Sequence, residues 1–429
     1  MERIIGSENI KGSEENFSEF AVDGKIPKLI VYPTSSEEIS EILRVANEEE
    51  ASICLRSQGT KIGTGNIPKS IDIVICMSRF CRIVEHDCGN LTVTVETGVK
   101  LSELQRVLED KKQFLPVDPV CSSKSSVGGI VASNSNGPRR LRYGSVRDLL
   151  IGMKAVLPTG QKIRAGGKVV KNVAGYDMCK LFVGSFGTLG IITEATFKLY
   201  PLPEVQKTIL LLFENTAQAF EHVSSLLGSV FFPASIVVLN YSALNFLSSK
   251  IDIALTENMC CLAIRLEGFA ESVQREYDEV QKMRVVYTQT FEGTEQDKFW
   301  TALSDFYCIS GSNFSFKGSV PVSITSNIFR RVEENSKNLE LSIGIISHAG
   351  SGIIYVFFST QELGKAIQFT NELGFYIEKE GGYFVVESAP SEVKKKINIW
   401  GYFSGGMKIM HDIKKKFDPG DILNPGRLI

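Results

Sequence analysis

The amino-acid sequence predicts an α+β protein with a boundary between two domains near residue 203. The first observation is that helical patterns alternate with β-rich runs, and that residues 81–87 and 91–98 have the pattern of an antiparallel pair. The second is the run 201–203, Pro-Leu-Pro, which continues neither a helix nor a central strand. The third is the length of 429 residues, which exceeds the usual size of one domain.

The elements follow in order from local patterns. A helix is expected to begin at Ser35, because Ser35 and Glu38 have capping-box spacing and apolar residues recur at helical intervals after them. The strand that follows, residues 51–56, runs into a glycine-rich loop. Later elements are a helix over 100–112, two strands joined by a turn at 158–160, a short helix over 176–185 and a strand over 190–200. Beyond residue 203, helices such as 216–228 and strands such as 260–269, 352–358 and 383–388 predict an α+β cap domain.

Composition and charge exclude several classes of protein. The chain has 43% hydrophobic and 22% charged residues and a formal net charge of −2, which provides no positive field for nucleic acid. No apolar run reaches the roughly 18 residues of a membrane-spanning helix, and residues 1–10 lack the features of a signal peptide. We therefore expect a cytoplasmic protein with no nucleic-acid partner and no integral membrane segment, which reaches a membrane only through partner chains.

The number and placement of the cysteines and histidines indicate whether the chain contains disulfides or a metal site. The cysteines are odd in number and stand mostly among apolar residues, so we expect reduced thiols rather than disulfides. They are Cys54, Cys76, Cys81, Cys88, Cys121, Cys179, Cys260, Cys261 and Cys308. No Cys-x-x-Cys motif occurs, and the four histidines, His86, His222, His348 and His411, are scattered. We therefore predict neither an iron–sulfur cluster nor a metal site within this chain.

Three glycine-rich segments in the first domain, 56–65, 122–137 and 184–190, together favour a ligand site, although each alone is also typical of tight turns. Glycine lets the backbone approach a ligand closely, and successive N–H groups in such a loop form a concave site for phosphate. The loop 56–61 is therefore suited to a pyrophosphate, with a lysine and two hydroxyls at hand. The small side chains of 122–137 leave room for a broad planar ring.

A basic run follows the second glycine-rich segment at Arg139, Arg140 and Arg142. These side chains are close enough in sequence to balance the charge of a phosphate-bearing cofactor, and the same run is equally typical of a solvated turn. The Rossmann fingerprint is absent, since no Gly-x-Gly-x-x-Gly lies between a strand and a helix with an acid about 20 residues later. The sequence therefore predicts a large planar cofactor with phosphates, bound by a fold other than the Rossmann fold.

Residues 125–203 resemble the FAD-binding fold of the vanillyl-alcohol oxidase (p-cresol methylhydroxylase, PCMH-type) superfamily. Three motifs that occur in order carry the likeness: KNVAGYD at 171–177, GSFGTLGIIT at 184–193 and ILNPGRL at 422–428. Among the members, the chain is most similar to the FAD-binding E-type subunit of glycolate oxidase complexes. The likeness is strong over residues 25–203 and over the last twenty residues, and weak between them.

The resemblance implies an N-terminal extension (1–24), a two-subdomain FAD-binding domain (25–203), a ferredoxin-like α+β cap (204–400) and a C-terminal segment (401–429) that returns to the FAD domain. It implies FAD held without a covalent link, because the first loop contains no histidine or cysteine; Cys121 is a remote exception. The implied FAD contacts are Arg56, Ser57, Gln58, Gly59, Thr60, Lys61, Ser125, Ser126, Gly128, Gly129, Ala132, Ser133, Tyr143, Gly144, Gly187, Gly190, Ile191, Thr193 and Asn424.

The chain departs from the family pattern in several places. Relatives often carry an acid where this chain has Phe186, and their caps often bear a metal site with the patterns HxGDGNxH and EHG. Here HAGSGIIY keeps His348 but has Ser351 and Tyr355 instead of an acid and a second histidine, and Glu387 lacks the following histidine. No arginine stands near FWTALSDFYC to hold a carboxylate. His348, Tyr355 and Glu387 are therefore candidate catalytic residues of an altered site without a metal.

Three functions follow from the resemblance. The first is an FAD-binding subunit of a multi-subunit 2-hydroxy acid dehydrogenase of the glycolate or lactate type, which accepts or relays electrons beside an iron–sulfur subunit and a second, catalytic FAD-containing subunit. The second is a self-sufficient FAD-dependent hydroxy acid dehydrogenase that uses His348, Tyr355 and Glu387. The third is a non-catalytic assembly subunit whose FAD is structural or absent.

Overall fold

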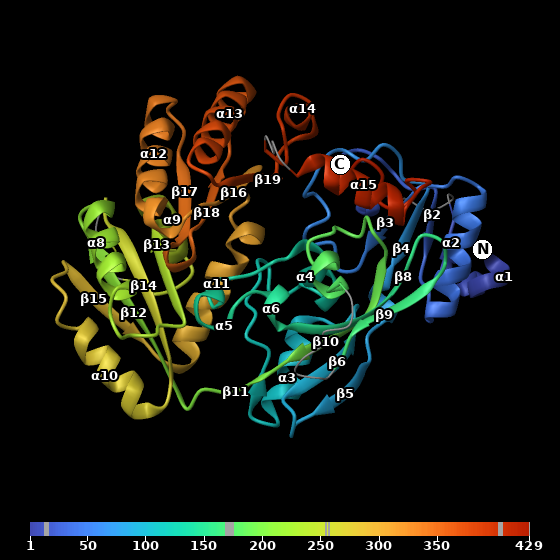
Figure 1. Ribbon diagram of the computed structural model, residues 1–429. Coiled ribbons are helices and arrows are strands. Elements are labelled where there is room, and N and C mark those ends of the chain that lie inside the picture. Colours follow the sequence, from blue (N-terminus) through green and yellow to red (C-terminus); the bar gives the residue numbers. More distant parts are fainter. Residues whose placement is uncertain (13–16, 168–175, 254, 256–257, 402–405, 429) are drawn as a thin grey trace.

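The computed structural model describes residues 1–12, 17–167, 176–253, 255, 258–401 and 406–428. Figure 1 shows two bodies side by side, one built from the first half of the chain and the other from the second half. The red C-terminal helix lies with the blue N-terminal part, so the chain returns to its first body. Most of the motif KNVAGYD falls on residues 168–175, which lie outside the described residues.

The first subdomain is a four-stranded sheet in the order β1-β2-β4-β3. Its strands are β1 (Ile10–Lys11), β2 (Leu29–Val31), β3 (Ile53–Arg56) and β4 (Ile73–Cys76), and helices α1 (Glu2–Ile5) and α2 (Ser36–Glu48) pack beside them. Both β2 and β3 run parallel to β4. The helix α2 begins as predicted, since the Ser35 hydroxyl accepts a hydrogen bond from the Glu38 N–H at 3.2 Å.

The second subdomain is an antiparallel sheet in the order β5-β6-β10-β8-β9. Its strands are β5 (Ile83–Asp87), β6 (Thr92–Glu96), β8 (Leu150–Val156), β9 (Lys162–Gly166) and β10 (Ile191–Lys198). Its helices are α3 (Leu101–Glu109), α4 (Val127–Ser133), α5 (Arg140–Tyr143), α6 (Val146–Leu149) and α7 (Met178–Phe182), and a small pair joins β7 (Gln113–Phe114) to β11 (Tyr200–Pro201). The predicted pair β5–β6 and the predicted turn between β8 and β9 are confirmed; Gly160 in that turn has a φ of 81°.

The cap is one eight-stranded antiparallel sheet in the order β15-β12-β14-β13-β17-β18-β16-β19. The strands are β12 (Val205–Phe213), β13 (Ser235–Leu239), β14 (Cys260–Gly268), β15 (Tyr287–Phe291), β16 (Phe314–Ser319), β17 (Ile343–His348), β18 (Ile353–Phe358) and β19 (Tyr383–Ser388). Helices α8 (Thr216–Leu227), α10 (Ala270–Val280), α12 (Thr325–Asn338) and α13 (Leu363–Lys379) share a core with one face. Helices α9 (Tyr241–Ser248) and α11 (Gly293–Ile309) share a core with the other.

Both faces of the cap sheet are buried, which explains its long apolar strands. Alternate residues of one strand point to opposite faces, so Ile209 and Leu211 join the core under α8 while Leu210 and Leu212 join the core under α11. The predicted α+β class, with a two-part first domain and an α+β cap, is confirmed. We propose the boundary at residues 203 and 204, because β11 ends at Pro201 and β12 begins at Val205.

The C-terminal segment crosses back from the cap through α14 (Ser391–Lys394) to α15 (Met407–Phe417) and the end of the chain. Its last residues pair with β3 of the first subdomain: the Ile53 N–H donates to the Ile422 carbonyl, and the Asn424 N–H donates to the Ile53 carbonyl, both at 2.7 Å. The buried Lys414 ammonium holds this segment by donating to the carbonyls of Thr188 at 3.0 Å and Leu423 at 2.9 Å.

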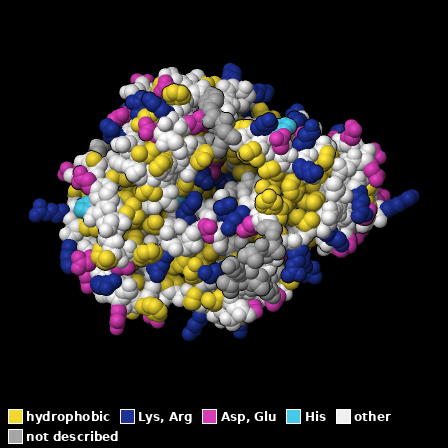
Figure 2. Space-filling view, in the orientation of Figure 1, with side chains coloured by type: hydrophobic (Ala, Val, Ile, Leu, Met, Phe, Trp, Pro, Cys, Tyr) yellow, Lys and Arg dark blue, Asp and Glu magenta, His cyan; other side chains and the backbone are white. Residues whose placement is uncertain are grey.

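The expectation that all cysteines are reduced is wrong. Cys121 and Cys308 form a disulfide with their Cα atoms 6.0 Å apart, and the other seven cysteines are free. The two residues are 187 positions apart, one in the first domain and one on α11 of the cap, so an odd count and apolar neighbours gave no sign of the pair. Among the helices of the described residues, none is long and apolar enough to cross a membrane, and Figure 2 shows basic and acidic side chains mixed over the visible face.

Candidate functional site

A cleft with an empty volume of about 910 Å³ opens in the first domain. Four segments that are far apart in sequence form it: the loop after β3, helix α4, the loop before β10 and the C-terminal segment. The residues that line it are Leu55, Arg56, Ser57, Gln58, Gly59, Thr60, Lys61, Ile62, Met77, Thr97, Ser126, Gly128, Gly129, Ala132, Ser133, Phe186, Gly187, Gly190, Ile191, Ile192, Asn424 and Arg427. Fifteen of the predicted FAD contacts are in this set.

The loop after β3 provides the polar end of the cleft. Gly59 has a φ of +73°, a conformation that glycine adopts without strain, and this turns the loop back beside the strand. The Ser57 hydroxyl oxygen is buried and has no hydrogen-bond partner among the described residues. A buried hydroxyl without a partner is costly, so the loop is built to receive a ligand that bonds to it.

Helix α4 forms a wall of the cleft. It contains two adjacent glycines, and the absence of a side chain has a different purpose at each of them. A Cβ at Gly128 would lie 2.7 Å from the Thr97 Cβ, so close packing of the fold excludes a side chain. A Cβ at Gly129 would meet only the Ser126 hydroxyl at 3.2 Å, so its lack of a side chain leaves room in the cleft. The same Ser126 hydroxyl caps α4 by accepting from the Gly129 N–H at 3.2 Å.

Four predicted contacts lie outside the lining of the cleft. The Ser125 hydroxyl donates to the Cys121 carbonyl at 2.9 Å, and the Thr193 hydroxyl donates to the Lys154 carbonyl at 3.3 Å. The Tyr143 hydroxyl donates to the Glu267 carboxylate of the cap at 2.8 Å. Gly144 ends α5 with a φ of 80°.

Sequence reasoning missed seven lining residues: Leu55, Ile62, Met77, Thr97, Phe186, Ile192 and Arg427. Arg427 belongs to the motif ILNPGRL, and its guanidinium donates to the Asn66 carbonyl at 2.7 Å and to the carbonyls of Ile62 and Thr64. It therefore fixes the segment that continues the first loop. The motif ILNPGRL could have identified Arg427 as a lining residue. Nothing in the sequence marks the apolar lining residues as parts of a cofactor site.

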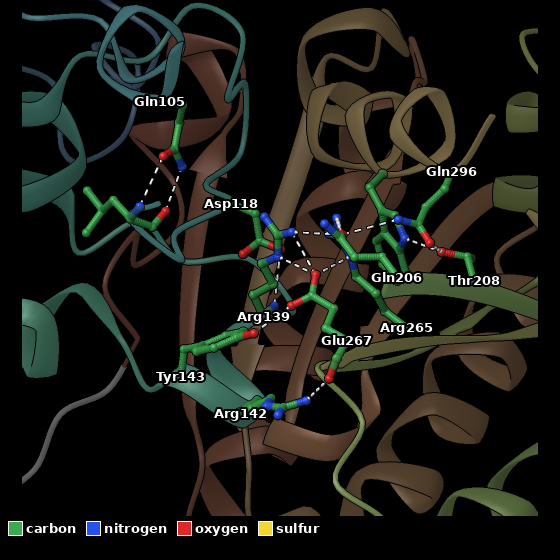
Figure 3. Close-up of polar contacts among 12 residues, drawn as sticks. Gln105, Asp118, Arg139, Arg142, Tyr143, Gln206, Thr208, Arg265, Glu267 and Gln296 are labelled. Atoms are coloured by element: carbon green, nitrogen blue, oxygen red, sulfur yellow. Dashed lines mark hydrogen bonds and ion pairs between the residues drawn. The ribbon is translucent and has the colours of Figure 1, made fainter. Parts of the chain in front are cut away.

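Neither alternative for Arg139 and Arg142, a phosphate contact or a solvated turn, describes the contacts in the structure, because the cap engages both. Figure 3 shows Arg139, Tyr143 and Arg265 converging on Glu267. The Arg139 Nε and Nη2 donate to the Glu267 Oε1 at 3.0 and 2.7 Å, and the Arg265 Nε lies 2.8 Å from the same oxygen. Burial acts to raise the pKa of Glu267, but the two guanidinium charges outweigh it and hold that pKa below its usual value. Arg142 donates to the backbone carbonyl of Glu267.

The cleft meets the cap at Lys61. The Lys61 Nζ lies 2.7 Å from the Glu387 Oε2 and 4.5 Å from the centre of the Tyr307 ring, with both charged side chains about nine-tenths buried. Lys61 lines the cleft and Tyr307 lines a smaller cavity between the domains. The ion pair therefore stands where the two spaces adjoin.

The smaller cavity contains two of the three predicted catalytic residues. His348, at the end of β17, and Tyr355, on β18, both line it, with ring centres 5.2 Å apart. Glu387 is not part of its lining and pairs with Lys61 instead. Burial, together with the charges of Lys317 and Arg140, lowers the pKa of His348 to about 3. Burial also raises the pKa of Tyr355, so both groups are neutral at physiological pH.

Two neighbouring cations, Lys317 and Arg140, form no salt bridge among the described residues. Burial lowers the pKa of Lys317, and the charge of the Glu387 carboxylate opposes that shift. The Lys317 ammonium lies 5.9 Å from the centre of the Tyr355 ring, because the two residues are directly opposed on β16 and β18. No group of three metal-ligating side chains occurs in the described part of the chain.

Comparison with known families decides the assignment. Residues 27–166 match the FAD binding domain family, and residues 202–428 match the C-terminal domain of FAD linked oxidases. The chain belongs to the FAD-linked oxidases. Like its family, this FAD-linked oxidase is an oxidoreductase with FAD as cofactor, and the predicted family is confirmed.

Relatives of this FAD-linked oxidase cover nearly its whole length. It is 32% identical to the glycolate oxidase subunit GlcD of Bacillus subtilis over 99% of this chain and 95% of the relative. It is 25% identical to a D-lactate dehydrogenase of Anaerostipes hadrus over 96% of this chain and 91% of that one. The fold is also that of p-cresol methylhydroxylase, with a TM-score of 0.77, 19% identity and coverage of 99% of this chain and 95% of that one.

The residues of the cleft fit FAD. The unpartnered Ser57 hydroxyl and the turn at Gly59 are suited to a phosphate, and the open side of Gly129 leaves room for the flat ring system. No histidine or cysteine is among the described residues that line the cleft.

Proposed function

We propose that this chain is the FAD-binding subunit of a multi-subunit 2-hydroxy acid dehydrogenase, and that a small hydroxy carboxylate of glycolate or lactate size is oxidised at the cap end of its cleft. The names of the relatives support the substrate class, since they include a glycolate oxidase subunit and D-lactate dehydrogenases. The FAD is proposed to be non-covalent, because the lining offers no nucleophilic histidine or cysteine.

The observation that carries the proposal is that Lys317 and Arg140, whose charges act on the cavity residue His348, form no salt bridge among the described residues. Part-buried cations without a salt bridge are unfavourable unless an anion reaches them, and a carboxylate is an anion of suitable size. A substrate whose carboxylate faces Lys317 and Arg140 would therefore place its hydroxyl toward the neutral His348 and Tyr355.

The chain's own residues then have distinct roles. Lys317 and Arg140 bind and orient the carboxylate, and Tyr307 and the Lys61–Glu387 pair lie where the cavity adjoins the cleft. The apolar side chains of Leu303, Ile346 and Phe357 limit substrate size and exclude water. FAD, when bound, supplies an acceptor for hydride and can pass electrons on singly.

The partners follow from what the chain lacks. A reduced flavin must pass its two electrons to an acceptor and can do so one at a time, and no cysteine motif for an iron–sulfur cluster occurs in the sequence. We propose an iron–sulfur subunit and a second FAD-containing subunit as neighbours, and a cytoplasmic location with membrane contact only through them.

A second role rests on a different observation. The Lys61–Glu387 pair engages an acid that sequence reasoning placed in the catalytic set. If this ion pair keeps Glu387 from acting in catalysis, the chain would relay electrons between partner subunits, or serve assembly alone, without oxidising substrate itself.

One experiment separates these roles. The chain is purified alone and its flavin absorbance is followed without oxygen as glycolate, D-lactate or L-lactate is added. The proposal predicts a yellow protein that one of these acids bleaches; acid precipitation should release the FAD into solution. A yellow protein that no hydroxy acid bleaches would favour the relay, and a colourless protein would favour an assembly subunit.

A further inference from the structure

The cavity between the domains holds a carboxylate from the FAD-binding domain as well as the histidine from the cap. Asp118 lines it together with the cap residues His348 and Tyr355. The Asp118 Oδ1 and the His348 Nδ1 are both enclosed and have no hydrogen-bond partner among the described residues. Two unpartnered polar atoms on one small cavity indicate a ligand that both donates and accepts hydrogen bonds.

The local fold holds Asp118 in place. Its Oδ2 accepts from the Arg139 N–H at 3.1 Å, which leaves Oδ1 as the free oxygen. Gly137, which also lines the cavity, packs against the carboxylate so closely that a Cβ there would lie 2.3 Å from the Asp118 Oδ1. Close packing on this side therefore restricts the movement of the carboxylate.

We propose that Asp118 is the catalytic residue that accepts the hydroxyl proton of the substrate, while neutral His348 binds the hydroxyl oxygen. This inference rests on the proposed function. A hydroxyl group matches the two free atoms, since its hydrogen donates to Asp118 and its oxygen accepts from His348 when the ring proton is on Nδ1.

The step balances in atoms and electrons. The O–H bond breaks and its proton moves to the Asp118 Oδ1, while the electron pair of that bond forms the carbonyl. The flavin, when bound, would supply the two-electron acceptor for the hydride from the same carbon. The products are a 2-oxo carboxylate and a protonated Asp118 that returns its proton to solvent.

The electrostatic surroundings agree with this division of roles. Burial raises the pKa of Asp118 to about 6, although Arg139 and Arg265 oppose the shift and Glu267 adds to it. A base with a pKa near the working pH is effective, whereas His348, with its pKa near 3, is a weak one. Tyr355 also faces Asp118, and its raised pKa keeps it neutral.

The test compares the FAD-loaded wild type with Asp118→Asn, and with Asp305→Asn as the matched control. Asp305 also has an enclosed Oδ1 without a partner, but its Oδ2 accepts from the Ser123 hydroxyl at 2.7 Å and it does not line the cavity. Two quantities are measured against pH: the rate of flavin reduction by the hydroxy acid found above, and the affinity of its 2-oxo product by calorimetry.

Asp118→Asn is expected to lose at least about 100-fold in reduction rate. In the wild type, product affinity should rise as the pH falls through about 6, because protonated Asp118 donates to the product carbonyl. Asp118→Asn should bind the product at least as well as the wild type at high pH, and without this pH dependence. Asp305→Asn should resemble the wild type in both measurements.

A reduction rate for Asp118→Asn within threefold of the wild type would overturn the inference and leave the proposed function intact. Loss of product binding together with loss of rate would assign Asp118 a structural role instead. If Asp118→Asn fails to fold, Asp118→Glu decides: a shifted but retained pH dependence of product binding supports the inference, and an unchanged one contradicts it. Failure of every hydroxy acid to reduce the wild type would overturn the proposed function and this inference with it.

Discussion

Arg139 of the FAD-binding domain and Glu267 of the cap form a buried ion pair across the domain boundary, with two guanidinium nitrogens on one carboxylate oxygen. The Arg139 side chain is 13% exposed and the Glu267 side chain is fully buried, so water screens their interaction little. Because the backbone of the same arginine holds Asp118, this pair links the position of the cap to the geometry of the cavity.

Replacement of Glu267 by glutamine should therefore destabilise the docked cap. The change leaves Arg139 and Arg265 without a counter-ion, and removal of one partner from a buried pair costs about 3–5 kcal/mol. Urea denaturation should show a lower midpoint or a separate early transition of the cap. Glu271→Gln, at an exposed position on α10, is the control and should change the unfolding free energy by less than about 0.5 kcal/mol.

The two adjacent glycines of α4 should respond differently to valine. Gly129→Val should weaken FAD retention while the protein without FAD keeps nearly its full stability, because the added side chain points into open space of the cleft. Gly128→Val should instead destabilise the protein without FAD by about 1–3 kcal/mol, because Thr97 occupies the space. Flavin content and thermal unfolding of both variants test this; equal losses in stability for both would mean that Gly129 serves the fold alone.

An acid in the first loop should abolish FAD binding. Gly59→Glu places a negative charge beside the phosphate cradle, where it repels a diphosphate. Gly59→Asn is the matched control, because asparagine tolerates the positive φ of this position without adding charge. A folded Gly59→Glu protein with normal flavin content would remove this loop from the cofactor site.

Stability should fall in mild acid because of His348. Its pKa is about 3 in the folded protein and near 6.5 in the unfolded chain, so between these values only the unfolded state takes up the proton. The free energy of unfolding should drop by up to about 1.4 kcal/mol per pH unit below pH 6.5 from this group. Asp118 has the opposite effect on stability, because its pKa is raised in the folded protein. The wild type is therefore compared with His348→Gln, which keeps Asp118 but should lack the loss of stability in acid that His348 causes. Identical pH slopes for the two proteins would show that His348 titrates normally.

Much of the fold follows from local sequence, and the site follows only in part. The capping residues Ser35 and Glu38, the turn at Gly160 and the glycines of the first loop act on neighbours in the chain, so their patterns are readable. The partners of Arg139 and Cys121 lie 128 and 187 residues away in the cap. No local pattern encodes such contacts, and for this reason neither the cap contacts of the arginines nor the disulfide was predicted.

Asp118 illustrates the same limit at the site itself. In sequence it is an ordinary acid between Val117 and Pro119, whereas His348 stands in a motif that draws attention. What distinguishes Asp118 is an enclosed oxygen without a partner on a cavity that two domains form together. This property belongs to the folded protein alone.

Oxidation of a hydroxy carboxylate beside Lys317 is the central claim, and a titration of the FAD-loaded chain tests it directly. Glycolate or lactate is added without oxygen to the wild type, to Lys317→Met and to the surface control Lys379→Met, and the loss of flavin absorbance is recorded against concentration. The account predicts that the wild type and Lys379→Met are bleached alike, and that Lys317→Met needs at least about tenfold more substrate, since a charge-assisted bond of about 1.5–3 kcal/mol is lost. Bleaching of Lys317→Met at the wild-type concentration, or no bleaching of the wild type by any small hydroxy acid, would contradict it.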